Sequence, residues 1–235
     1  MSENARHAST APHRFPMNGR PPRRPVRTPA PAAVAGSVRI IGGRWRGTRL
    51  PVADSPGLRP SADRVRETLF NWLQPVLPGA VVLDLFAGSG ALGLEAVSRG
   101  AARAVLVERD PVQAAGLRAT VQKLQGQAQV QVVQDDALRW LAALEAGVQF
   151  DIAFLDPPFD DGLWQAALQA LLPRMAGSAW LYLESPATRA PEVPAPWLLH
   201  RELRTAQARA ALYRGPAGQG LSTSGSAPAT PANRR

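Results

Sequence analysis

Residues 80–93 read AVVLDLFAGSGALG, and this stretch decides the fold. The apolar residues 80–86 predict a buried strand, and the spacing G-x-G-x-x-G that follows predicts a tight turn into a helix. Dinucleotide-binding proteins share this spacing, so the glycines by themselves leave the cofactor open. Asp84 favours S-adenosylmethionine, because a carboxylate at the strand end repels a pyrophosphate and attracts the ammonium and sulfonium of that cofactor.

Strand-like and helix-like segments alternate along the rest of the chain. Strands are expected at residues 104–107, 130–134, 150–155 and 179–184, helices at 91–98, 111–124, 137–145 and 163–172, and a closing antiparallel pair at 197–203 and 208–213. Before them, residues 37–51 predict a hairpin that turns at Gly42-Gly43, and Ser61 and Asp63 are expected to cap a helix that runs to Leu73. We therefore expect an α/β fold with a doubly wound, mostly parallel Rossmann-like sheet of the class I methyltransferase type and an N-terminal hairpin-plus-helix extension.

Acidic residues directly follow the strands expected at residues 104–107 and 130–134. Ligands of doubly wound sheets bind beyond the carboxyl ends of the strands, where Glu108 can accept from ribose hydroxyls and Asp136 from the adenine amine. Helix capping is the alternative role for Glu108, Asp135 and Asp136, since a helix follows each of them. Their succession behind the glycine turn favours an adenosyl cofactor. The expected cofactor-binding residues are Asp84, Phe86, Ala87, Gly88, Ser89, Gly90, Glu108, Arg109, Asp136 and Ala137.

The fourth strand ends in the tetrapeptide Asp156-Pro157-Pro158-Phe159. Two prolines fix the backbone and remove two N–H donors, which leaves the Asp156 carboxylate and the Pro157 carbonyl as acceptors. Two acceptors that bind both N–H bonds of a conjugated amine draw it toward a tetrahedral, nucleophilic geometry and aim its lone pair. Phe159 offers a face on which an extruded base can stack. These four are the expected catalytic residues; the alternative is a structural proline turn with Asp156 as a helix cap.

The composition excludes several kinds of catalysis and indicates a polyanionic partner. The 235 residues include no cysteine, three histidines and one lysine, so thiolate chemistry is excluded and no metal site is expected. The net charge of +9 favours a nucleic acid. No apolar run approaches the roughly 20 residues of a membrane span. The N-terminus is basic without the apolar core of a signal peptide, so a cytoplasmic protein with no membrane partner is expected.

Four segments are expected: a disordered basic leader (1–36), an RNA-binding hairpin and helix (37–77), a methyltransferase core (78–214) and a disordered tail (215–235). The leader holds six arginines and one acid, and it serves either RNA affinity or solubility. In the second segment arginines interleave with Trp45, as in surfaces that grip phosphates and stack bases. The alternative is that Trp45 covers the core and the arginines are a solvated face. The expected RNA-binding residues are Arg39, Arg44, Trp45, Arg46, Arg59, Arg64 and Arg66.

Three segments before the glycine turn are the specific part of a family resemblance. They read RIIGGRWRG (39–47), GLRP (57–60) and DRVRETLFNWL (63–73). With the glycine turn, the tetrapeptide and residues 197–213, they resemble the bacterial 16S rRNA (guanine(966)-N2)-methyltransferase family over about three quarters of the chain. The tetrapeptide alone resembles the catalytic motif of amino-group methyltransferases in general.

The resemblance implies transfer of a methyl group from S-adenosylmethionine to the exocyclic N2 of a guanine in 16S rRNA, within an assembled or assembling small ribosomal subunit. It implies that Asp84 and the glycine turn hold the methionyl end of the cofactor, Glu108 the ribose, and Asp136 with Ala137 the adenine. The family can have Asn where this chain has Asp136. Residues 156–159 would hold the guanine, and we expect a monomer.

Three other functions remain open at this point. A DNA adenine or cytosine methyltransferase shares the tetrapeptide, but it normally needs a larger target-recognition region than this chain offers. A protein glutamine methyltransferase usually has Asn at the position of Asp156. A non-catalytic RNA-binding protein explains the charge but not the tetrapeptide beside a cofactor turn.

Overall fold

The computed structural model describes residues 36–52, 60–158 and 162–216. Its strands are β1 (Gly36–Arg39), β2 (Arg49–Val52), β3 (Val81–Asp84), β4 (Arg103–Glu108), β5 (Val130–Gln134), β6 (Phe150–Leu155), β7 (Met175–Pro186), β8 (Leu198–Arg204) and β9 (Ala208–Arg214). Its helices are α1 (Pro60–Leu73), α2 (Ala91–Ser98), α3 (Pro111–Lys123), α4 (Ala137–Ala143), α5 (Trp164–Leu171) and the short 3-10 helix η1 (Leu172–Arg174). The predicted leader, Arg59, Phe159 and nearly all of the predicted tail lie outside the described residues.

The larger sheet has the strand order β5-β4-β3-β6-β7-β9-β8. The strands from β5 to β7 pair in parallel, and β9 pairs antiparallel with both β7 and β8. The chain leaves β3 toward β4 on one side and later returns to β6 on the other side, so the strand order switches direction at β3. This confirms the predicted doubly wound sheet, whose ligands are expected at that switch point.

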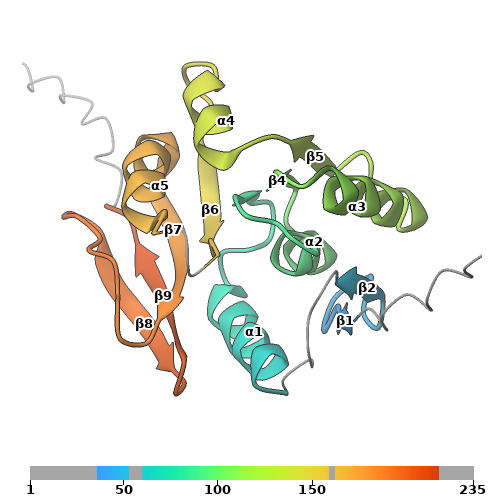
Figure 1. The fold of residues 1–235 in the computed structure, drawn as a ribbon, viewed down its shortest axis with the longest axis horizontal. Helices are drawn as coiled ribbons and strands as arrows, with labels where there is room; N and C mark the ends of the chain where they lie inside the picture. The colour runs from blue at the N-terminus through green and yellow to red at the C-terminus, as the bar shows by residue number, and fades with distance from the viewer. Residues whose placement is uncertain (1–35, 53–59, 159–161, 217–235) are drawn as a thin grey trace, which may run out of the picture. The chain divides into compact units, whose positions relative to one another are not determined.

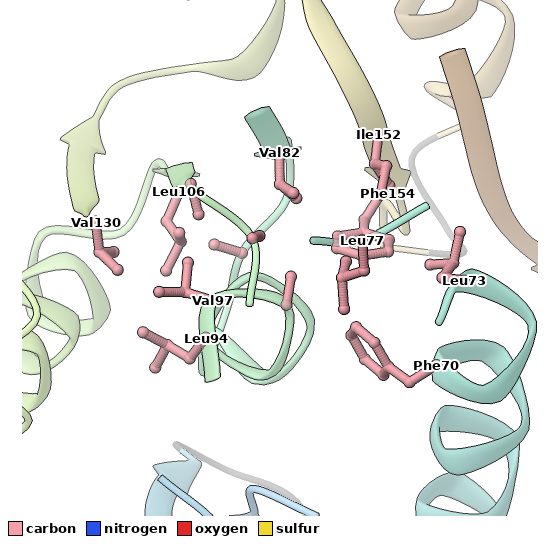
Figure 2. Close-up of a cluster of buried hydrophobic side chains, with 14 of the residues drawn as sticks. Phe70, Leu73, Leu77, Val82, Leu94, Val97, Leu106, Val130, Ile152 and Phe154 are labelled. Atoms are coloured by element: carbon pink, nitrogen blue, oxygen red, sulfur yellow. The ribbon is translucent and has the colours of Figure 1, made fainter. Parts of the chain in front are cut away.

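Helices cover both faces of the sheet, as the continuously apolar strands require. Side chains of α1, α2 and α3 belong to one buried cluster, and those of α4 and α5 belong to a second. These two groups of helices lie on opposite sides of the sheet (Figure 1). In the first cluster, Phe70 of α1 meets Phe154 of β6 edge to face, with ring centroids 5.9 Å apart. Leu94 and Val97 of α2 lie beside Leu106 of β4 (Figure 2). Helix α1, which precedes the sheet in sequence, is therefore part of the same core.

The hairpin prediction was correct in its pairing and wrong in its turn. β1 and β2 pair antiparallel, but residues 40–48 connect them as a loop instead of a two-residue turn at Gly42-Gly43. Gly43 has a φ of +74°, and a Cβ there would lie 1.8 Å from the carbonyl oxygen of Ser98. The glycine pair is therefore required by close contact with α2 and not by a tight turn.

Several element boundaries also differ from the prediction; strand β3, for example, ends at Asp84 instead of residue 86. Helix α1 begins at Pro60, a favoured first position, so Asp63 lies inside its first turn and pairs with Arg66 at 3.0 Å instead of capping it. Strand β7 begins at Met175, four residues before the predicted start. Helix α4 ends at Ala143, two residues early.

Candidate active site

A cavity of about 620 Å³ opens beyond the carboxyl ends of β3, β4, β5 and β6. Its place at the switch point is where a doubly wound sheet binds its ligand. Much of its wall is formed by residues that the sequence predicted to bind the cofactor or the target amine. They are Phe86, Gly88, Glu108, Arg109, Asp136, Ala137, Asp156, Pro157 and Pro158. The structure therefore brings six of the ten predicted cofactor residues and three of the four predicted catalytic residues to one cavity.

Glu108 ends β4 and holds the glycine turn in place. Its Oε2 accepts from the N–H of Gly88 and its Oε1 from the N–H of Asp110, both at 2.8 Å. The turn ends at Gly90, whose φ of +74° lies in the left-handed region that favours glycine, directly before α2. Each carboxylate oxygen can accept more than one hydrogen bond, so binding of ribose hydroxyls by Glu108 stays a prediction.

Asp84 lies beneath the glycine turn and does not line the cavity. Its side chain is only 2% exposed, and its Oδ2 accepts from the N–H of Gly93 at 2.9 Å. Burial, with a smaller effect of the Glu108 carboxylate, raises the pKa of Asp84 to about 7. Asp84 thus positions the first turn of α2, and its predicted contact with the methionyl end of a cofactor stays a prediction.

Three residues of the turn, Ala87, Ser89 and Gly90, lie outside the cavity wall. Ala87 is buried and donates its N–H to the carbonyl of Val107 at 2.9 Å, and Gly90 donates to the carbonyl of Ala87 at 2.7 Å. Ser89 lines a second cavity of about 260 Å³ beside α3 and β2, which it shares with Gly88. These residues shape the turn through their backbone, as glycine-rich loops do.

Asp135 and Asp136 both have a structural partner at the start of α4. Asp136 caps the helix, because its Oδ1 accepts from the N–H groups of Leu138 and Arg139 at 3.0 Å. Asp135 forms an ion pair with Arg139, which lowers the pKa of Asp135. Both capping bonds of Asp136 use Oδ1 and the side chain is exposed at the cavity, so a second role toward an adenine stays a prediction.

Asp156 follows β6 directly and forms the cavity wall together with the two prolines. Burial raises the pKa of the Asp156 carboxyl well above its ordinary value, and the neighbouring carboxylates of Glu184 and Asp84 raise it further. A carboxylate with a raised pKa binds a proton more strongly. This property suits a group that accepts hydrogen bonds from the N–H groups of an amine.

The hairpin loop is docked on α2 by a polar anchor. Glu95, fully buried within the apolar helix α2, accepts from the N–H groups of Ile41 at 2.6 Å and Gly42 at 2.7 Å, and from Nε of Arg99 at 2.6 Å. Ser98 donates to the carbonyl of Gly42 at 2.6 Å and accepts from the N–H of Trp45 at 2.9 Å. The loop's backbone groups are therefore satisfied by side chains of α2.

Trp45 is a core residue and not the stacking face that was predicted. Its side chain is 8% exposed, and it packs so closely on Gly126 that a Cβ there would lie 2.9 Å from the indole ring. The guanidinium of Arg44 lies over the indole at 4.1 Å and also donates to Gln129. The indole is covered because the loop needs an apolar contact with the core.

Arg66 requires a similar correction, because it is 7% exposed. Its guanidinium donates to the carbonyl of Arg39 at 2.6 Å and pairs with Asp63, so it ties α1 to the end of β1. Burial lowers the pKa of Arg66 despite that ion pair. The side chains of four other predicted RNA contacts are exposed: Arg39, Arg44, Arg46 and Arg64.

Neither a membrane span nor a metal site is found in the described part of the chain. None of its helices has the length and apolar character needed to cross a membrane. Its histidines, aspartates and glutamates form no group of three that could hold a metal ion.

Comparison with known proteins supports the resemblance drawn from the motifs. Residues 38–214 match the family described as "Conserved hypothetical protein 95". The ribosomal RNA small subunit methyltransferase D of Escherichia coli K12 is 48% identical over 77% of this chain and 91% of its own length. Its Haemophilus influenzae counterpart is 40% identical over 76% of this chain and 94% of its own length. A solved putative methyltransferase from Escherichia coli is 46% identical, covers 77% of this chain and 99% of its own, and superposes with a TM-score of 0.70.

The chain belongs to this family. It is therefore a methyltransferase with the class I fold, as predicted, and the alternative of a non-catalytic RNA-binding protein is disfavoured. In this family member the motif at residues 39–47 forms the loop that α2 anchors and the motif at residues 63–73 lies in α1, so both are structural parts of the enzyme as well as a signature.

Sequence reasoning missed several residues of this methyltransferase site. Glu95 stands alone among the apolar residues of α2, and that isolation was a usable signal of a buried polar contact. Glu184 ends the strand predicted at residues 179–184, as the other acids end theirs, and it was passed over. Asp110 and Gln113 line the cavity from the start of α3, which no pattern had indicated.

Proposed function

We propose that this methyltransferase transfers a methyl group from S-adenosylmethionine to the exocyclic N2 of a guanine in 16S rRNA. The observation that carries the proposal is the single cavity in which the acidic strand ends and the Asp156-Pro157-Pro158 turn meet. The family's relatives bear the name of ribosomal RNA small subunit methyltransferases, which supports the choice of substrate. We further propose that it acts as a monomer in the cytoplasm, on an assembled or assembling small subunit.

The residues of the cavity fit this cofactor. Glu108, Asp135, Asp136 and Asp156 line it, and their carboxylates would repel the pyrophosphate of a dinucleotide. The same carboxylates attract the positively charged ammonium and sulfonium groups of S-adenosylmethionine. When bound, this cofactor supplies an electrophilic methyl group. Glu108 would hold the ribose, Asp136 with Ala137 the adenine, and the turn supported by Asp84 would contact the methionyl end.

The protein's own contribution to the reaction is to bind and orient the amine. The Asp156 carboxylate and the Pro157 carbonyl accept from its two N–H bonds and turn its lone pair toward the methyl donor. The prolines keep these two acceptors in place, because neither residue can rotate about φ. Phe159 would stack on the base. Metal chemistry has no part in this proposal.

Exposed arginines around the docked loop are the proposed contacts with RNA. Arg39, Arg46 and Arg64 lie on the hairpin and on α1, and Arg44 flanks Trp45. Because the loop is held by α2, these charges are fixed before the RNA binds and lose less entropy than charges on a flexible tail. Arg59 and the leader are further candidates.

Mass spectrometry of 16S rRNA nucleosides from cells that lack this gene tests the proposal. We expect the loss of one N2-methylguanosine and its restoration by the wild-type gene but not by the Asp156→Ala variant. An unchanged nucleoside profile would overturn the proposed substrate. Binding of S-adenosylmethionine to the purified protein, measured by calorimetry, tests the cofactor independently.

A further inference from the structure

A second carboxylate, that of Glu184, lies beside Asp156 near the carboxyl end of the neighbouring strand β7. β6 and β7 pair in parallel, with Phe154 opposite Tyr182 and Leu155 opposite Leu183, so Asp156 and Glu184 are the next residues on the two strands. Side chains alternate along a strand, so both acids lie on the face occupied by Phe154 and Tyr182. The rings of those two residues are 6.1 Å apart in one buried cluster, which confirms that they share that face.

Glu184 is held in a defined position. Its Oε2 accepts from the hydroxyl of Tyr182 at 2.7 Å, and its backbone carbonyl accepts from Nε1 of Trp164 at 2.8 Å. Tyr182 is 2% exposed, whereas Glu184 keeps part of its surface accessible. Within the described ranges neither Asp156 nor Glu184 forms an ion pair with a cation. No cation therefore holds either of these adjacent carboxyl groups in its ionised form.

We propose that Glu184 is the proton-accepting partner of Asp156, and that it receives, through Asp156, the proton that the target amine loses. This inference rests on the proposed methylation of an exocyclic amine. A nitrogen that has gained a methyl group carries a positive charge and must lose one proton. The N–H bond breaks with its electron pair remaining on nitrogen, and the proton bonds to an oxygen of Asp156. It then moves to Glu184 and from there to water, which restores the Asp156 carboxylate.

The electrostatics of the site agree with this role. Burial raises the pKa of Glu184 although the hydrogen bond from Tyr182 opposes the change. The titratable groups that face the pair are Asp84 at the end of β3 and Tyr182 on β7; burial and the nearby carboxylates raise the pKa of Tyr182, so it remains a donor. Two adjacent carboxyl groups cannot both ionise easily, so such a pair readily takes up one proton.

Glu184→Gln tests the inference, because the amide oxygen still accepts from Tyr182 while the side chain can no longer take a proton. Glu145→Gln, an exposed change far from the cavity, is the matched control. In the free protein, the Asp156 carboxyl followed by ¹³C NMR should titrate about one pH unit lower in Glu184→Gln, because a neighbouring negative charge is gone. The rate of single-turnover methyl transfer at saturating RNA and cofactor should fall by roughly a hundredfold. The KM for RNA, measured separately under steady-state conditions, should not change.

The pH profile of the rate and a second variant distinguish a loss of proton transfer from a change in the shape of the site. We expect the acidic limb of the rate profile to change in Glu184→Gln, and Glu184→Asp to recover a large part of the rate because it restores a carboxylate. Glu184→Asp as slow as Glu184→Gln would overturn the inference, as would a normal Asp156 titration in Glu184→Gln. If the wild-type enzyme itself methylates no rRNA, the proposed function fails, whereas an active wild type with an equally active Glu184→Gln overturns only the role of Glu184.

Discussion

The anchor on α2 and the carboxyl edge of the sheet both bury acidic side chains, and they treat them in opposite ways. Glu95 at the anchor accepts from two backbone N–H groups and from Arg99 within 2.7 Å. At the edge of the sheet, Asp156 lies beside Glu184 and near Asp84, and burial together with these carboxylates raises its pKa. One region satisfies its charge completely, and the other places like charges together.

This difference separates a part built for stability from a part built for chemistry. A buried carboxylate with a full set of donors fixes the geometry of what it binds, here the loop that carries the family's specific motifs. Adjacent carboxylates without cations cost stability, and such an arrangement persists where a reaction uses it. Five predictions test this comparison.

Removal of the anchor should have the largest effect. Glu95→Ala leaves the half-buried Arg99 guanidinium and two loop N–H groups without their acceptor, so we expect a loss of about 3–5 kcal/mol in the free energy of unfolding. Urea unfolding measures it, with the exposed Glu145→Ala as control. A loss below about 1 kcal/mol would mean that the loop does not depend on the anchor.

At the edge of the sheet, substitution should damage activity without damaging the fold. Asp156→Asn removes one member of the acidic cluster, so methyl transfer should fall roughly a hundredfold while the unfolding midpoint rises. Affinity for S-adenosylmethionine should stay within about twofold, because this residue binds the amine. Lower stability with normal turnover would contradict both halves of the comparison.

Asp84 should make stability depend on pH. Its pKa is raised from 3.8 to about 7, so between these values the unfolded state is ionised while the folded state stays protonated, and stability falls as pH rises. From pH 5 to pH 7 this contributes a loss of about 2 kcal/mol. Asp84→Asn should flatten the pH dependence of the free energy of unfolding by that amount, and an unchanged slope would show that Asp84 is ionised in the folded protein.

Glu108 supports the glycine turn and is also the proposed contact for the ribose. We therefore expect its substitution to change both the affinity for the cofactor and the stability of the turn. Glu108→Gln can still accept one backbone N–H but loses its charge, and we expect the Kd for S-adenosylmethionine to rise about tenfold. Calorimetry measures the affinity and thermal unfolding the stability. A lower unfolding temperature with normal affinity would restrict Glu108 to supporting the glycine turn.

The exposed arginines of the hairpin should give the smallest effect. Replacing Arg39 and Arg46 with alanine should weaken RNA binding a few fold and reduce the salt dependence of log K by about 1.4, as two phosphate contacts on single-stranded RNA would. Replacing Arg103 and Arg118, also exposed, removes the same charge elsewhere and serves as control. Equal effects of the two pairs would show that net charge and not the hairpin determines affinity.

Much of this site was predictable because its residues stand at strand ends. Alternating apolar segments predicted the parallel sheet, and that topology brings residues 84–90, 108, 136 and 156 to one edge whatever the details of packing. The support that Glu108 gives to the glycine turn was not predictable, since its acceptance of the Gly88 N–H depends on how a loop twenty residues away folds back. Glu184 illustrates the same limit, because only the pairing of β6 with β7 places it beside Asp156.

By itself the sequence determined the class of fold, the glycine turn and the acceptor-rich tetrapeptide, since each depends on local periodicity or on the chemistry of adjacent residues. Tertiary structure alone decided which charges are free to meet a ligand. Trp45 and Arg66 resemble RNA contacts in a linear pattern, yet one covers Gly126 and the other ties α1 to β1. Burial is a property of the whole fold, because a side chain's exposure depends on segments distant in sequence that pack against it.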